Sequence, residues 1–263
     1  MTDPAAATPH ERAAAAIRVG DVFTRARIMF FGRWASYCAL MAIGYAPLGM
    51  GEALVAFAAT HPAPPRAPQD TGDAIAIGVI VGLGFLAAFV GLLLAPAAIA
   101  YGVAQEITGR GLSFGQCIGA ALRRSLAVLA VSAVVVILGG LGALLLIVPG
   151  LIVFSIYSVA IPACMAERIG PLKAMSRSAF LTKGNRWRVF GLLALLYILG
   201  VVIDLMVSRA ATAAVGALPA LIVVLPVKIG VAAFSAVVAA VLYAQLRAAR
   251  EGVDVERIVK VFD

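Results

Sequence analysis

Several apolar runs in this chain are long enough to cross a lipid bilayer, and they constrain its fold more than any other feature. They cover residues 34–59, 74–105, 126–148, 151–166 and 189–208, followed by a last stretch at 210–246. A helix needs about 20 residues to cross roughly 30 Å of hydrocarbon. The sequence therefore predicts an all-α fold, a polytopic transmembrane helical bundle of about six spans.

Composition agrees with this interpretation, because 63% of the residues are hydrophobic and only 13% are charged. A soluble domain carries about 25% charged residues, enough to cover its surface. A chain this apolar has too few polar side chains to do so. The composition therefore excludes an ordinary soluble globular protein.

Two of the runs need a further assignment. Run 151–166 is short, but it follows run 126–148 directly through Pro149-Gly150, which predicts a helical hairpin. The last stretch contains Pro219 and Pro226 and has room for one span or two. We expect its second half, 229–246, to span and residues 210–227 to be non-spanning or re-entrant.

The basic residues support this topology, since 18 of the 21 lysines and arginines lie in the N-terminal segment, the C-terminal tail and two alternate connectors. Cationic residues collect on the cytoplasmic side of membrane proteins. We therefore predict a cytoplasmic segment at 1–33, a six-span domain at 34–246 and a cytoplasmic tail at 247–263. A seventh span would place the basic tail outside. Residues 61–73, rich in proline, are predicted to form an extended outer loop without helix.

The cytoplasmic segments before the first, third and fifth spans share a pattern. Each begins at a glycine (Gly20, Gly111 or Gly170), continues as an amphipathic stretch, and ends at arginine beside the membrane. A basic amphipathic helix can lie in the headgroup layer with its apolar side toward the lipid. The pattern predicts three repeats of a cytoplasmic interfacial helix and a transmembrane hairpin.

The third of these segments carries the strongest lipid-binding signal. Pro171 suits the first position of a helix, and one helical face would carry Leu172, Met175, Ala179 and Phe180. Tryptophan prefers the headgroup level of a membrane, and Trp34 and Trp187 each follow an arginine. The candidate contacts with anionic lipid headgroups are Arg177, Lys183, Arg186 and Arg188.

The second half of the chain resembles a bacterial family that includes the membrane domain of some glycerophosphoryl diester phosphodiesterases and the YciC-like inner-membrane proteins. The matching residues are Pro149-Gly150, Pro162, Glu167-Arg168, Gly170, Ala174, Ser178, Lys183-Gly184-Asn185 and Arg186-Trp187-Arg188. The resemblance implies a multi-pass protein of the bacterial cytoplasmic membrane. It implies no diesterase activity, because that family's catalytic barrel is a separate soluble domain for which this chain has no room.

Ionisable residues inside membrane spans are costly and are candidates for function. Asp204 and Lys228 form a candidate intramembrane polar site, in which Asp204 would pair with Lys228 or Arg209. The interpretation that we favour is that Glu52, Asp204 and Lys228 all lie at the outer interface. Glycines at 78, 82, 84, 139, 140 and 142 are expected to permit close helix packing.

The chain contains no motif for nucleotide binding, nucleophilic catalysis or metal coordination. Cys38, Cys117 and Cys164 are expected to be small apolar residues of the interior. We therefore predict no enzyme activity, no cofactor, no metal and no nucleic-acid partner. The expected function is a membrane component that contacts anionic lipids in envelope or lipid homeostasis. The alternatives are a small transporter, or a partner subunit that recruits another protein through the tail; a homo-oligomer is also compatible with the sequence.

Overall fold

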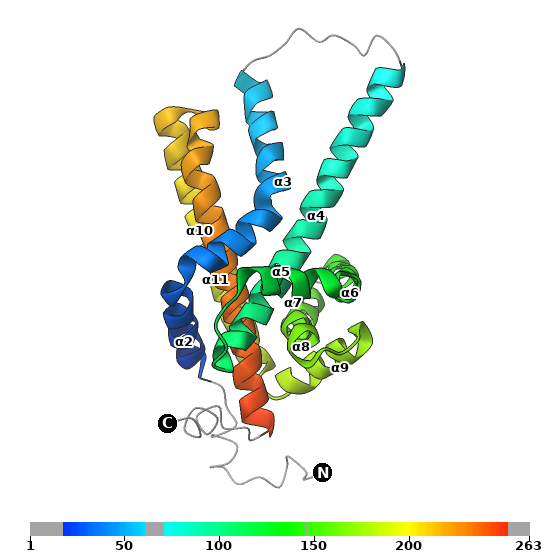
Figure 1. The fold of residues 1–263 in the computed structure, drawn as a ribbon, viewed down its shortest axis with the longest axis vertical. Helices are drawn as coiled ribbons and strands as arrows, with labels where there is room; N and C mark the ends of the chain where they lie inside the picture. The colour runs from blue at the N-terminus through cyan, green and yellow to red at the C-terminus, as the bar shows by residue number, and fades with distance from the viewer. Residues whose placement is uncertain (1–17, 61–70, 146, 252–263) are drawn as a thin grey trace.

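The computed structural model describes residues 18–60, 71–145 and 147–251, and the regular elements in these ranges are all helices (Figure 1). This confirms the predicted all-α bundle. Five helices are long and apolar enough to cross a membrane: α3 (Trp34–Thr60), α4 (Thr71–Ile107), α6 (Ser125–Leu145), α10 (Arg186–Val215) and α11 (Ala217–Glu251). They indicate a multi-pass integral membrane protein.

The three predicted amphipathic segments form short helices, each followed directly by a long one. They are α2 (Val19–Gly32), α5 (Phe114–Arg123) and α9 (Pro171–Thr182), and they lead into α3, α6 and α10. Gly170 is the N-cap of α9 and Pro171 is its first residue, as expected. The order of elements therefore repeats three times: a short helix, a long helix and a returning segment.

The predicted fourth span is divided into α7 (Ile147–Tyr157) and α8 (Ala160–Glu167). Pro162 has no N–H to donate to the carbonyl of Ser158, which favours a break there. At 1.5 Å per residue, the 11 residues of α7 measure only about 17 Å. Pro149 and Gly150 lie inside α7, and not between the two helices of the hairpin as predicted.

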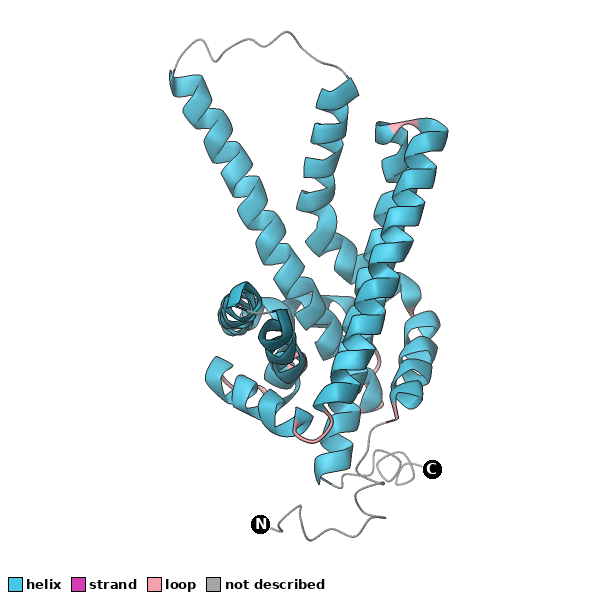
Figure 2. Cartoon of the chain, turned by 180° about the vertical axis from the view of Figure 1, so that it is seen from behind, coloured by secondary structure: helices cyan, strands magenta, loops and turns pink. Residues whose placement is uncertain are grey.

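Helices α4, α10 and α11 and the second part of α3 run along the long axis of the molecule, whereas the first part of α3 bends away from this axis and the α6–α7 hairpin does not follow it (Figures 1 and 2). Both α6 and α7 are strongly foreshortened from the front and from behind, so this hairpin lies at a steep angle to the long axis. The beginning of α2 and the end of α11 lie at the same end of the molecule.

A tight turn at Gly216 separates α10 from α11, and the φ angle of +85° at this position favours glycine. Residues 210–227 therefore contain the end of one helix and the beginning of the next. This agrees with the expectation that they do not form a separate span. In contrast, α4 already begins at Thr71, inside the segment predicted to be free of helix, and residues 61–70 lie outside the described part of the chain.

The largest hydrophobic core lies at the end of the bundle where the three short helices gather. Val22, Ala26 and Phe30 of α2 are buried in it, and the rings of Phe23 and Phe30 each lie 5.4 Å from that of Phe234 in α11. The buried face of α2 therefore packs on protein. Cys117 and Cys164 are buried free thiols and Cys38 is half-buried, in line with their expected role in the interior.

Helices α3 and α4 approach most closely at two glycines that the sequence did not single out. A Cβ on Gly44 would lie 2.5 Å from the carbonyl oxygen of Gly91, so neither position has room for a side chain. Of the glycines expected to permit packing, Gly139 lies against Phe154, but a Cβ on Gly82 or Gly84 would meet no atom within 4 Å. Beyond this crossing, α3 and α4 diverge (Figure 1).

Candidate functional site

The basic connector between α9 and α10 is the first candidate site, and α9 is held in place by its inner face. Ala174, Met175, Ser178 and Leu181 are buried. The Ser178 hydroxyl donates a hydrogen bond of 2.6 Å to the carbonyl of Ile156, at the end of α7. Only part of the helical face that was predicted to meet lipid is therefore accessible, because Met175 is buried whereas Leu172 and Phe180 are exposed.

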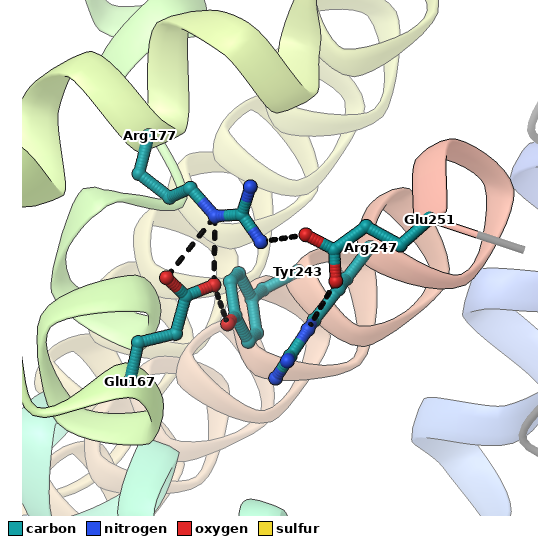
Figure 3. A network of polar contacts seen from close by, with 5 residues as sticks. All are labelled: Glu167, Arg177, Tyr243, Arg247 and Glu251. Atoms are coloured by element: carbon teal, nitrogen blue, oxygen red, sulfur yellow. Dashed lines mark hydrogen bonds and ion pairs between the residues drawn. The ribbon is translucent and has the colours of Figure 1, made fainter. Parts of the chain in front are cut away.

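A polar network joins α9 to α8 and α11 (Figure 3). Oε1 of Glu167 accepts hydrogen bonds from Nε of Arg177 at 2.8 Å and from the hydroxyl of Tyr243 at 2.7 Å. Arg177 also pairs with Glu251, which accepts a hydrogen bond of 2.8 Å from Nε of Arg247. The positive charge of Arg177 is thus already compensated by two carboxylates.

Two arginines and one aromatic ring fix the connector that follows α9. The guanidinium carbons of Arg177 and Arg250 lie 5.9 and 5.5 Å from the centroid of the Phe180 ring. Arg250 also donates a hydrogen bond to the carbonyl of Lys183. Gly184 permits the turn with a φ angle of +90°. The three residues Lys183-Gly184-Asn185 therefore form the tight connection that the sequence indicated.

The remaining predicted lipid contacts, Lys183, Arg186 and Arg188, are all exposed. Within the ranges 18–60, 71–145 and 147–251, no carboxylate pairs with Lys183 or Arg186. Trp187 stands beside them with 76% of its surface exposed, in the first turn of the apolar helix α10. Cations next to an exposed indole at the base of an apolar helix are typical of the headgroup level of a membrane.

The second candidate site lies near the other end of the bundle, where three charged residues come together. Nζ of Lys228 lies 2.9 Å from Oε1 of Glu52 and 3.9 Å from Oδ1 of Asp204. The structure thus places Asp204 beside Lys228. It also places the Glu52 carboxylate there, closer to Lys228 than the Asp204 carboxylate is. Arg209, the other predicted partner, is exposed.

These three side chains line a cavity of about 340 Å³, which Tyr45 and Ser235 also line. Asp204 is 18 residues beyond Arg186, about 27 Å along α10 at 1.5 Å per residue. That distance is close to the thickness of the hydrocarbon layer. With Arg186 at one membrane surface, the charged cluster would therefore lie near the opposite surface, which is the interpretation that the sequence favoured.

Two further interactions were not anticipated from the sequence, and both join ends of helices in the basic half of the molecule. Glu106, at the end of α4, pairs with Arg33 at 2.8 Å and accepts a hydrogen bond of 2.5 Å from the Tyr37 hydroxyl. Arg124 donates to the carbonyls of Cys164 and Ile169 at 2.9 and 3.2 Å. The sequence contained one signal for these contacts, since Glu106 and Glu167 are each a single glutamate at the end of an apolar run. These contacts bring the predicted cytoplasmic connectors to one end of the molecule.

Chemically, these arrangements can hold charge and position helices. The described residues contain no group of three or more His, Cys, Asp or Glu side chains that could hold a metal ion. No family model, curated protein or solved structure matches the chain. The resemblance to the phosphodiesterase membrane-domain family therefore stays a prediction.

Proposed function

We propose that this integral membrane protein is a non-enzymatic component of a bacterial cytoplasmic membrane that contacts anionic lipid headgroups through the α9–α10 connector. The observation that supports this most is the exposed cationic pair Lys183 and Arg186 beside exposed Trp187, at the base of α10. Each cationic side chain near an anionic leaflet contributes about 1 kcal/mol of attraction.

The proposal assigns different tasks to the four basic residues named from the sequence. Lys183, Arg186 and Arg188 contact lipid. Arg177 positions α9, because its guanidinium is held between Glu167 and Glu251. In this orientation the basic connectors and both ends of the chain face the cytoplasm, in agreement with the bias of basic residues toward that side.

Arg186 and Arg209 provide a matched test, because both are exposed arginines of α10 and lie toward its opposite ends. Arg186→Gln should reduce the phosphatidylglycerol that copurifies with the protein, measured by mass spectrometry against phosphatidylethanolamine. Arg209→Gln removes the same charge and should leave this ratio unchanged. Equal ratios in the wild type and both variants would contradict the proposal.

A second candidate function, a small transporter, is favoured by the cavity that Glu52, Asp204 and Lys228 line together. In transporters the substrate site usually lies near the middle of the membrane, so this function requires the charged cluster to lie deeper than its distance from Arg186 along α10 indicates. Under this alternative, Asp204→Asn abolishes uptake of a solute into cells while the protein still accumulates in the membrane. Equal solute uptake by cells that contain the protein and by cells that lack it would exclude this function.

A further inference from the structure

A cavity in the basic half of the molecule lies between α4, α5, α8 and the beginning of α6, and measures about 1130 Å³. Four arginines line it: Arg110, Arg123, Arg124 and Arg168. They come from three different connections in the chain, so only the folded structure brings them together. None of these residues belongs to the α9–α10 connector.

The positive charge around this cavity has no counter-charge in the described residues. The lining contains no aspartate or glutamate. The two glutamates that end the neighbouring helices point to other partners, since Glu106 pairs with Arg33 and Glu167 pairs with Arg177. Guanidinium groups that share one cavity repel one another unless an anion lies between them. The cavity is therefore built to receive negative charge.

Arg124 also gives the cavity a defined wall. Its guanidinium donates to the carbonyls of Cys164, Arg168 and Ile169, which fastens the beginning of α6 to the end of α8. Carbonyl groups at the end of a helix carry only partial negative charge. Arg124 is therefore oriented by these bonds but keeps its net positive charge.

Glycines leave room for a ligand on the opposite wall. Gly111, Gly115 and Gly119 are spaced four residues apart and all line the cavity, whereas Cys117 and Ala121 on the other side of α5 are buried against the bundle. A Cβ at Gly115 or Gly119 would meet no atom within 4 Å. A ligand can thus approach the backbone of α5 closely.

We propose that this cavity binds a phosphate-bearing anion, and that the anion is the headgroup of an anionic phospholipid. Arginine binds phosphate through two parallel hydrogen bonds, and basic pockets between membrane helices accept lipid headgroups. Leu122 and Leu126, on either side of the arginine pair 123–124, are exposed at 58% and 83%. Apolar surface next to the cations suits acyl chains and favours a lipid over free phosphate.

This inference rests on the proposed contact with anionic lipid and gives it a specific site. The test uses the full chain in a non-ionic detergent, titrated with phosphatidylglycerol, phosphatidylcholine or inorganic phosphate, with Kd measured by native mass spectrometry. Arg110→Gln/Arg123→Gln should raise the Kd for phosphatidylglycerol about 25-fold, or about fivefold for each arginine. Phosphatidylcholine should bind weakly to all forms.

A second variant fills the cavity without changing charge. Gly119→Leu should remove tight binding of phosphatidylglycerol and is compatible with the helix, since leucine favours helix more than glycine does. Gly191→Leu on α10 is its control, because that glycine is exposed and also has no atom within 4 Å of an added Cβ. The control should bind like the wild type.

The outcomes separate this site from the connector. If Lys183→Gln/Arg186→Gln loses phosphatidylglycerol binding while the two cavity variants bind like the wild type, the inference is overturned and the proposed function stays intact. Unchanged binding in all these variants would overturn both. Inorganic phosphate that binds at least as tightly as phosphatidylglycerol, and loses affinity in the cavity variants, would support the anion site but overturn the lipid as its ligand.

Discussion

The hydroxyl of Tyr243 donates a hydrogen bond of 2.7 Å to Oε1 of Glu167, and the same oxygen accepts from Nε of Arg177. One carboxylate thus joins α8 and α9, which are neighbours in the sequence, to the distant helix α11 (Figure 3). The contact explains how a short helix with a modest apolar face keeps a fixed position beside the bundle.

Removing the Tyr243 hydroxyl tests this contact. Tyr243→Phe should lower the free energy of unfolding by about 1 kcal/mol, the usual value for one hydrogen bond. Glu167→Gln should have a larger effect, because it also removes the charge that faces Arg177. The measurement is the midpoint of unfolding in a dodecyl sulfate titration followed by circular dichroism. Tyr197→Phe is the control, since Tyr197 is 74% exposed; equal midpoints for the two tyrosine variants would contradict the assignment.

The close approach of α3 and α4 depends on Gly44. A leucine there must displace the backbone of Gly91, so Gly44→Leu should destabilise the protein by about 2 kcal/mol, as overpacking does. The midpoint of thermal unfolding in detergent measures this loss. Gly82→Leu introduces the same side chain on α4 where an added Cβ has open space, and should leave the midpoint within error. Similar losses for both variants would show that the crossing is not as tight as described.

Arg124 stabilises the end of α8, where the chain turns at Arg168, which has a φ angle of +54°. Arg124→Gln leaves carbonyls of this helix end without their donor and should lower the free energy of unfolding by about 2 kcal/mol. Hydrogen exchange of the amides in α8 should rise in parallel. The neighbouring exposed residue supplies the comparison: Arg123→Gln should change stability by less than about 0.5 kcal/mol. An equal loss in both variants would argue against the capping role.

The charged cluster of Glu52, Asp204 and Lys228 predicts a non-additive pair of substitutions. Lys228→Met leaves Glu52 and Asp204 beside each other without a cation and should destabilise by about 2 kcal/mol. Adding Glu52→Gln removes one of these carboxylates and should recover part of the loss. Unfolding midpoints of the two single variants and the double variant measure the coupling. A double variant less stable than Lys228→Met would contradict the pairing.

Much of this architecture could be predicted from the sequence, because the length of an apolar run and the position of basic residues are local properties. The three short helices, the turn at Lys183-Gly184-Asn185 and the long helices α3, α4, α6, α10 and α11 follow from such signals. The break between α7 and α8 was missed although Pro162 was visible. A single proline is tolerated inside α11 at Pro226, so its effect depends on the neighbouring helices.

The sites were harder to predict, because they depend on which helix ends meet. Arg177 was expected to face lipid, but Glu167 and Glu251 come from elements whose position the sequence did not give. Arg110 and Arg123 were assigned only to topology, and the cavity that joins them to Arg168 exists only after α5 has packed on α4. The role of Gly44 depends in the same way on Gly91, its neighbour across the helix crossing.

The arrangement of the connectors relative to the membrane is the central claim, and cysteine accessibility tests it most directly. In a chain whose three native cysteines are replaced by alanine, Ser176→Cys places a thiol on the exposed side of α9. Gln69→Cys places one in the segment 61–70, which follows α3 and precedes α4 in the sequence. A membrane-impermeant maleimide should label Gln69→Cys in spheroplasts, and Ser176→Cys only in inverted membrane vesicles. Labelling of both positions from the same side of the membrane would contradict the account.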